Sequence, residues 1–188
     1  MKCSAYIATS ADGFIARPDG SVDWLDSAGE PEKGTDAPGY VDFATFFATV
    51  DCMIMGRKCM ETISGFNLTP DQWPYGDTRI VVLSRTLTQP TAGLFGNVEM
   101  YDGELFALLD KLERDGHSHA YVDGGTTIQS FLALGLMNEL ILTRMPILIG
   151  EGISLFGPVM RDLHLRNVSA VACPSGYVQQ RYTVAYDA

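Results

Sequence analysis

The chain has 188 residues, of which 46% are hydrophobic and 19% are charged. That balance is typical of a folded globular protein and excludes disordered, collagen-like and coiled-coil chains. Thirteen basic and 23 acidic residues give a net charge of −10, which excludes the broad basic surface that nucleic-acid binding requires and disfavours anionic membranes.

The length predicts one domain over residues 1–188. No apolar run approaches the roughly 18 residues that span a bilayer, and the N-terminal segment becomes polar too early for a signal peptide. We therefore expect a cytoplasmic protein. The four cysteines form no CxxC pair and have no histidine at metal-ligand spacing, so we expect buried thiols in a reducing compartment and no metal site.

The predicted elements of the first half begin with a buried strand at residues 2–9. A long polar stretch rich in turn residues follows as far as Gly39, and such loops are usually functional. Apolar residues at helical spacing predict a helix at residues 40–49. A buried strand at residues 51–56 precedes a short helix at 57–63, and further strands are predicted at 79–83 and 98–101.

In the second half, leucines at positions 105, 108, 109 and 112 predict a helix. A strand at residues 119–123 leads through two glycines into a helix that ends at Gly135. Residues 138–145 form another strand, and residues 165–173 and 177–186 a closing antiparallel hairpin. The alternation of strands and helices predicts an α/β fold with a mixed, mostly parallel central sheet.

Three of the predicted strands end in residues that suit a phosphate group, at the edge where open α/β sheets bind ligands. Glycines admit a close backbone approach, a helix N-terminus offers free N–H groups, and arginine holds a phosphate with two parallel hydrogen bonds. We also expect a positive φ at Gly125. Each set alone also fits a tight connection or a solvated turn. The three sets are Gly124, Gly125, Thr126 and Thr127; Gly56, Arg57 and Lys58; and Ser84 and Arg85.

Five segments occur in one order along the chain: SADGFIA (10–16), DCMIMGRKCMETI (51–63), IVVLSRTL (80–87), YVDGGTTIQSFL (121–132) and ELILTRMPILIGEGISLF (139–156). In this order they resemble the dihydrofolate reductase superfamily. The more similar branch contains the C-terminal reductase domain of the bifunctional riboflavin-biosynthesis deaminase-reductase and its small stand-alone relatives. The deaminase signature HxE…PCxxC is absent, so deamination is not expected.

The resemblance implies a three-layer α/β/α fold and an NADPH site. Arg57 matches the arginine that grips the adenosine 2′-phosphate, and Ser84 and Arg85 match the second half of that clamp. The turn from Gly124 to Thr127 matches the pyrophosphate-binding turn. Ala8 and Ile15 match positions whose backbone meets the nicotinamide carboxamide.

These observations predict an NADPH-dependent reductase that transfers hydride to a C=N or C=O bond of a small heterocyclic or ribosyl-linked substrate. The implied relative is the 5-amino-6-(5-phosphoribosylamino)uracil reductase of riboflavin biosynthesis. The alternatives are a dihydrofolate reductase or a non-catalytic nucleotide-binding protein on the same fold.

Asp42, on the predicted helix at 40–49, is the candidate proton donor, and we expect burial to raise its pKa. The alternative is an exposed carboxylate at a helix start, with the proton coming from water. The resemblance and the apolar segment ELILTRMPILIG also favour a homodimer, because an exposed apolar strand promotes association.

Overall fold

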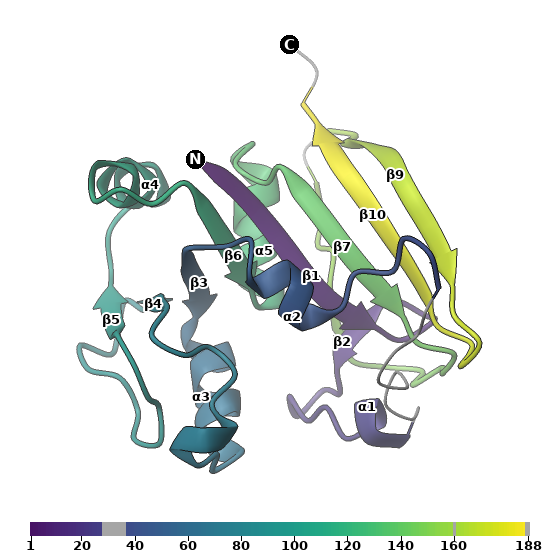
Figure 1. Cartoon of the computed structure of the whole chain (residues 1–188), viewed down its shortest axis with the longest axis horizontal. Coiled ribbons are helices and arrows are strands. Elements are labelled where there is room, and N and C mark those ends of the chain that lie inside the picture. The colour runs from purple at the N-terminus through teal and green to yellow at the C-terminus, as the bar shows by residue number, and fades with distance from the viewer. Residues whose placement is uncertain (28–36, 160, 187–188) are drawn as a thin grey trace.

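A computed structural model describes residues 1–27, 37–159 and 161–186 of the chain (Figure 1). Strands and helices alternate through the first three quarters of it, as the sequence predicted. The elements in chain order are β1 (Lys2–Thr9), β2 (Phe14–Ala16), α1 (Trp24–Ser27), α2 (Phe43–Phe47), β3 (Cys52–Gly56), α3 (Arg57–Gly65), the 3₁₀ turn η1 (Pro70–Gln72), β4 (Arg79–Leu83), β5 (Val98–Tyr101), α4 (Leu105–Arg114), β6 (His119–Asp123), α5 (Gly125–Ala133), β7 (Glu139–Arg144), β8 (Ile153–Ser154), β9 (His164–Ala172) and β10 (Val178–Ala185).

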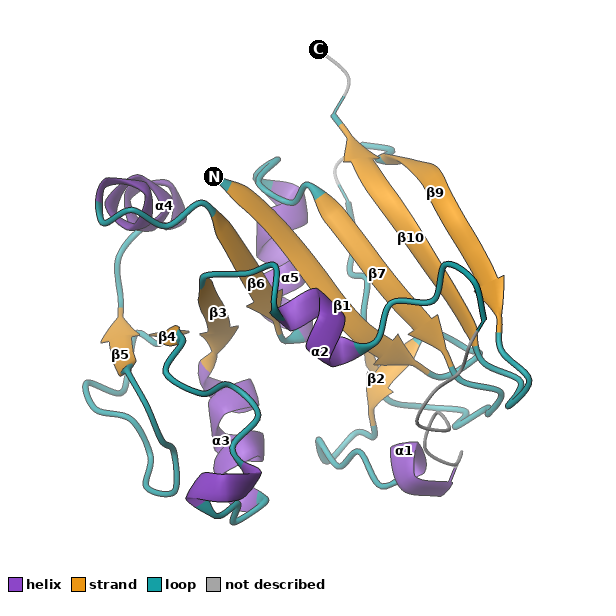
Figure 2. Cartoon of the chain, viewed as in Figure 1, coloured by secondary structure: helices purple, strands orange, loops and turns teal. Residues whose placement is uncertain are grey.

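Eight of the described strands form one twisted sheet in the order β5-β4-β3-β6-β1-β7-β10-β9 (Figure 2). The first six run parallel to one another, whereas β10 is antiparallel to both β7 and β9. The prediction of a mostly parallel sheet closed by a C-terminal antiparallel hairpin is therefore confirmed. The short strands β2 and β8 pair separately.

Helices cover both faces of this sheet, which gives the three layers (Figure 2). Alternate residues of a strand point to opposite faces, and in β3 both sets are buried, as expected for an internal parallel strand. On one face, α4 and α5 pack on Cys52 and Ile54 through Leu108, Leu112, Ile128 and Phe131. On the other, α2 and α3 pack on Met53 and Met55 through Phe46, Met60 and Ile63.

The stretch predicted as a polar loop up to Gly39 contains two elements, β2 and α1, although residues 28–36 lie outside the described part of the chain. Trp24 on α1 is fully buried and packs with Met145, Cys173 and Tyr177. Its partners lie far away in the sequence, and the polar residues around it hide any periodic apolar pattern. The sequence therefore did not reveal the short elements within this stretch.

The helix predicted at residues 40–49 is shorter than expected and spans Phe43–Phe47. The helix begins directly after Asp42, which is its N-cap: the Asp42 carboxylate accepts a hydrogen bond from the backbone N–H of Thr45 at 2.7 Å. A residue that caps a helix in this way has extended backbone angles and lies outside the helix.

The first half of the apolar segment at residues 139–150 forms β7, an interior strand between β1 and β10, whereas Leu148 in its second half is exposed. Leu140 is 0% exposed and Ile141 is 2% exposed. The argument for association through an exposed apolar strand at this position is therefore wrong. The edge strand on this side of the sheet is β9, on which Leu165 and Val168 are 38% and 56% exposed.

The cysteines agree with their interpretation as small apolar residues: all four are free thiols, and Cys3, Cys52 and Cys173 are buried. In the described ranges, we find no helix with both the length and the apolar composition needed to cross a membrane.

Candidate functional site

Two helix N-termini open at the edge of the sheet where the parallel strands end (Figure 1). Strands β3 and β6 are neighbours, with Met55 paired to Asp123, and each runs directly into a helix. The residues that precede α3 and α5 are Gly56 and Gly124, which have no side chain to cap the first N–H groups. Uncapped N–H groups and the positive ends of two helix dipoles make this edge suitable for an anion.

The two helices approach each other through glycines. A Cβ atom on Gly56 would lie 2.9 Å from Oγ1 of Thr127, and one on Gly124 would lie 3.4 Å from Cβ of Cys59. Gly124 also has a φ of +92°, a conformation that other residues rarely adopt. Thr127 is buried in this contact, whereas Thr126 is exposed on the first turn of α5.

Ile15 covers the start of α5. A Cβ atom on Gly125 would lie 2.6 Å from Cδ1 of Ile15 and 3.6 Å from the carbonyl oxygen of Ser154. The structure thus brings together Ile15 and Gly125, which are far apart in the sequence. The positive φ expected at Gly125 belongs to Gly124, so that expectation is wrong by one residue.

Cationic side chains follow the neighbouring strands β3 and β4, whose last residues Gly56 and Leu83 are paired. Arg57 and the exposed Lys58 begin α3, and the exposed Arg85 follows β4. Arg57 pairs with Glu61 at 2.6 Å. Among the described residues, Lys58 and Arg85 have no ion-pair partner.

Ser84 is buried and shapes the turn after β4. Its Oγ accepts hydrogen bonds from the backbone N–H groups of Leu87 at 2.9 Å and Thr86 at 3.2 Å. These bonds hold the buried Ser84 side chain inside the turn, and the next residue, Arg85, is exposed.

Ala8 lies where β1 and β6 separate. The two strands pair only from Lys2 to Ser4, although β6 continues to Asp123, and the rest of β1 pairs with β7 on its other side. The hydroxyl of Tyr121 bridges the separation by donating to the carbonyl oxygen of Tyr6 at 3.1 Å. The half-buried Ala8 follows, near the carboxyl end of β1.

A carboxyl group that we did not single out from the sequence lies under the glycine turn. Asp123 ends β6; its Oδ1 accepts from the N–H of Gly124 at 2.9 Å, and its Oδ2 accepts from the thiol of Cys59 at 2.9 Å. Burial raises the pKa of the Asp123 carboxyl above its ordinary range. Burial and the nearby Asp123 also raise the pKa of the Cys59 thiol. Asp123 thereby ties α3 to the turn that starts α5.

The expectation that burial raises the pKa of Asp42 is wrong. Asp42 is exposed, and hydrogen bonds from the backbone N–H and the hydroxyl of Thr45 lower its pKa. A carboxyl group with a lowered pKa is ionised at neutral pH and has no proton to donate. The structure assigns Asp42 to helix capping.

The sheet topology is that of the dihydrofolate reductase-like fold class. A model of the RibD C-terminal domain matches residues 2–179, and the chain belongs to this family. It is 32% identical over 167 residues to the uncharacterized protein YwjB of Bacillus subtilis (strain 168). The aligned residues cover 88% of each chain.

Solved structures show the same fold. A putative riboflavin biosynthesis protein from Shewanella sp. PV-4 superposes with a TM-score of 0.85 at 33% identity, covering 99% of this chain and all of that one. A diaminohydroxyphosphoribosylaminopyrimidine deaminase/5-amino-6-(5-phosphoribosylamino)uracil reductase from Thermotoga maritima superposes with a TM-score of 0.67 at 12% identity. The match covers 98% of this chain and 56% of that protein.

Proposed function

We propose that the protein is an NADPH-dependent reductase of the riboflavin-pathway type, acting on a C=N or C=O bond of a small heterocyclic or ribosyl-linked substrate. The observation that carries this proposal is the pair of uncapped helix N-termini beside Arg57, Lys58 and Arg85 at one edge of the sheet. Membership of the RibD C-terminal domain family supports it.

Residues at this edge of the sheet are available for the 2′-phosphate, the pyrophosphate and the nicotinamide of NADPH. Arg57, Ser84 and Arg85 receive the 2′-phosphate, and Lys58 adds positive charge at the start of α3. The turn from Gly124 through Gly125 and Thr126 to Thr127 receives the pyrophosphate on the N–H groups of α5.

Ala8, which lies where β1 and β6 separate, and Ile15, which covers the start of α5, would hold the nicotinamide. NADPH, when bound, supplies the hydride, and the chain orients it and limits access of water. Because Asp42 is an ionised helix cap, the proton for the substrate heteroatom comes from water.

The Arg57–Glu61 pair sets how readily the phosphate is bound. Both side chains are 39% exposed, and such an i, i+4 pair contributes only about 0.3–0.5 kcal/mol. A hydrogen bond between arginine and phosphate is worth about 1.5–3 kcal/mol, so a 2′-phosphate displaces Glu61 with a net gain.

Calorimetric titration with NADPH and NADH tests this function. Native protein is expected to prefer NADPH, and Arg57→Ala to weaken NADPH binding about 10- to 150-fold with little effect on NADH. Glu61→Gln frees Arg57 and is expected to tighten NADPH binding about two-fold. Arg114→Ala removes an equal charge from an exposed position on α4 and serves as the control.

Equal affinity of the native protein for the two dinucleotides contradicts the NADPH proposal. Turnover is then measured with pyrimidine and pterin substrates. Tight NADPH binding with no reduction of any of them supports the alternative of a non-catalytic nucleotide-binding protein, whereas reduction of dihydrofolate supports a dihydrofolate reductase.

We further propose that the protein works in the cytoplasm as a homodimer that binds neither nucleic acid nor membrane. The four free thiols fit a reducing compartment. The edge strand β9, with Leu165 and Val168 exposed, fits pairing with β9 of a second copy. Light scattering is expected to give the mass of a dimer for the native chain and of a monomer for Val168→Lys; a native monomer contradicts this assembly.

A further inference from the structure

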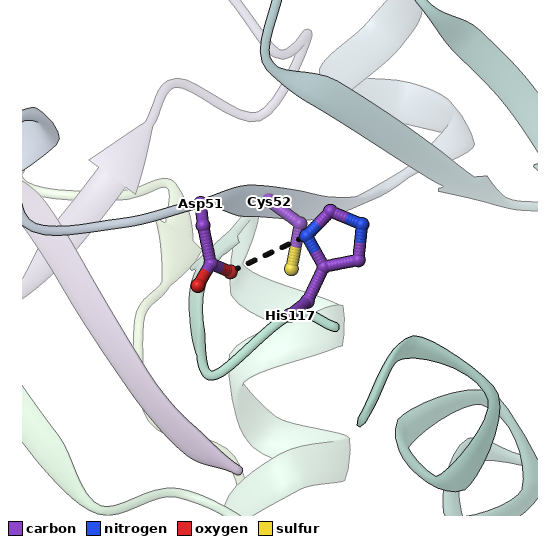
Figure 3. Close-up of side chains that lie close together, drawn as sticks. All are labelled: Asp51, Cys52 and His117. Carbon is purple, nitrogen blue, oxygen red and sulfur yellow. Dashed lines mark ion pairs between the residues drawn. The ribbon is translucent and has the colours of Figure 1, made fainter. Parts of the chain in front are cut away.

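Three side chains with different metal-binding atoms converge at the opposite end of the sheet from the dinucleotide edge (Figure 3). Asp51 directly precedes β3, Cys52 is its first residue, and His117 lies in the turn between α4 and β6. One carboxylate oxygen, the sulfur and one imidazole nitrogen lie within 4.8 Å of one another. Asp51 Oδ1 lies 3.5 Å from His117 Nδ1.

Hydrogen bonds hold this arrangement in place. Asp51 Oδ2 accepts from both the N–H and the hydroxyl of Ser118 at 2.8 Å, and the N–H of Asp51 donates to the carbonyl oxygen of His119 at 3.0 Å. These bonds tie the turn before β6 to the start of β3. The N–H of His119 lies 3.3 Å from both carboxylate oxygens, Oδ1 also faces His117, and Cys52 is fixed in the buried strand.

The charges around the cluster suit a cation. Arg79 reaches the far side of His117, with Nη1 at 3.4 Å from Nε2, but Glu99 and Asp115 each pair with its guanidinium at 2.7 Å. Lys111 also pairs with both carboxylates, at 3.9 and 3.3 Å, so these four charges balance and Asp51 leaves the cluster with a net negative charge. The two carboxylates hold Arg79 when its contact to Nε2 is lost. A metal ion on Nδ1 moves the imidazole proton to Nε2, and Arg79 can retain its two ion pairs.

We propose that Asp51, Cys52 and His117 bind a zinc-class divalent cation. A donor set of sulfur, nitrogen and oxygen is that of Zn²⁺, whereas Ca²⁺ and Mg²⁺ take oxygen ligands. Tetrahedral Zn²⁺ with these donors requires neighbouring ligand atoms about 3.3–3.6 Å apart, which the contact between Asp51 and His117 already meets. On binding, the Cys52 thiol releases its proton to water and the thiolate becomes the ligand. Water takes the fourth position.

The cluster is independent of the proposed reductase function, and sequence spacing did not reveal it. Metal-binding motifs are recognised in a sequence from ligands that lie a few positions apart. Cys52 and His117 are far apart in the sequence and meet only because β3 and β6 are neighbours in the sheet. A bound metal ion would fasten the turn after α4 to the start of β3 and stabilise the folded chain without touching the dinucleotide edge.

Titration with Co²⁺ as a spectroscopic substitute for Zn²⁺ tests the site on the intact protein. One equivalent is expected to produce a thiolate-to-cobalt band in the near ultraviolet and intense visible bands of tetrahedral cobalt, and Zn²⁺ is expected to remove both. Cys52→Ser is expected to lose the ultraviolet band, whereas Cys173→Ser is the matched control that keeps it.

A second variant, His117→Gln, keeps the test informative if Cys52→Ser does not fold. His117 lies in a turn and its side chain is 20% exposed, so the fold should tolerate this substitution. It is expected to weaken Zn²⁺ binding by more than about 100-fold, since losing even a hydrogen-bond partner of a ligand costs about 10- to 100-fold. Zn²⁺ is also expected to raise the melting temperature of native protein and not of His117→Gln. Absence of the cobalt bands in native protein, or their persistence in both variants, overturns the proposal.

Discussion

The two ends of the parallel strands differ in how their charged groups are satisfied. At the amino end, Glu139 is buried between Lys2 and Arg181, and Ser4 donates a hydrogen bond to it. At the carboxyl end, Lys58 and Arg85 have no ion-pair partner among the described residues, and the first N–H groups of α3 and α5 have no side-chain cap.

The difference separates stabilisation from binding. A carboxylate that is buried between two cations, as Glu139 is, contributes to folding and has little capacity left for a ligand. Uncapped N–H groups and cations without partners contribute less to folding and become favourable when an anion arrives. We therefore expect substitutions at the carboxyl end to change dinucleotide affinity, and substitutions at the amino end to change stability.

Gly125→Val is expected to have the largest effect, a loss of NADPH affinity of at least about 100-fold. The added side chain meets Ile15, which covers the start of α5. Because Gly125 is buried and its Cβ would lie 2.6 Å from Cδ1 of Ile15, Ile15 has to move and the melting temperature is expected to fall, although the φ of Gly125 is not positive. Gly65→Val, at the open end of α3, is the control. A Gly125→Val protein that binds NADPH with native affinity contradicts the pyrophosphate site.

Glu139→Ala addresses the amino end and is expected to reduce the free energy of unfolding by about 2 kcal/mol, since it removes hydrogen bonds from charged partners to a buried carboxylate. Urea denaturation measures the loss. Glu99→Ala, which removes a 40% exposed partner of Arg79, should cost less than about 1 kcal/mol. NADPH affinity should stay unchanged in both variants. A loss of NADPH affinity in Glu139→Ala would contradict the separation of stability at the amino end from binding at the carboxyl end.

Asp42→Ala is expected to cost about 1 kcal/mol of stability through loss of the α2 cap, and Asp42→Asn to keep the cap. Neither should alter the hydride-transfer rate or its pH profile, measured in single turnovers with any substrate that is found. A drop of about 10²–10⁴-fold in Asp42→Asn would restore Asp42 as the proton donor.

The smallest effect concerns acid stability. Burial acts to raise the pKa of Glu139, but hydrogen bonds from Lys2 and Arg181 outweigh it and lower the pKa. The unfolded chain therefore binds more protons as the pH falls from about 4.3, and the stabilisation by Glu139 is lost as the pH falls through the lowered pKa. In Glu139→Gln, the free energy of unfolding should fall less steeply as the pH is lowered through this range. The slope, measured by urea denaturation at several pH values, should decrease by less than about 1.4 kcal/mol per pH unit. An unchanged slope contradicts the assignment.

The local patterns in the sequence predicted most of the fold. The leucine spacing of α4, the strand that ends at Gly124 and the turn in the C-terminal hairpin each need only a few adjacent residues. The candidate cofactor residues could also be predicted from adjacent residues, because a glycine or arginine that follows a buried strand can be recognised in the sequence. Asp123 stood in the same motif, but its bond to Cys59 depends on a contact between β6 and α3.

The sequence by itself therefore determined the α/β class, the order of the strands of the main sheet and of the helices after residue 40, and the residues at the carboxyl ends of the strands. Only the tertiary structure decided that β7 is an interior strand, that Trp24 is buried, that Asp42 caps a helix, and that Asp51 and Cys52 meet His117. The physical reason is the range of the interactions. Periodicity and turn chemistry act between neighbours in the chain, whereas burial and pKa depend on residues that only the assembled sheet brings into contact.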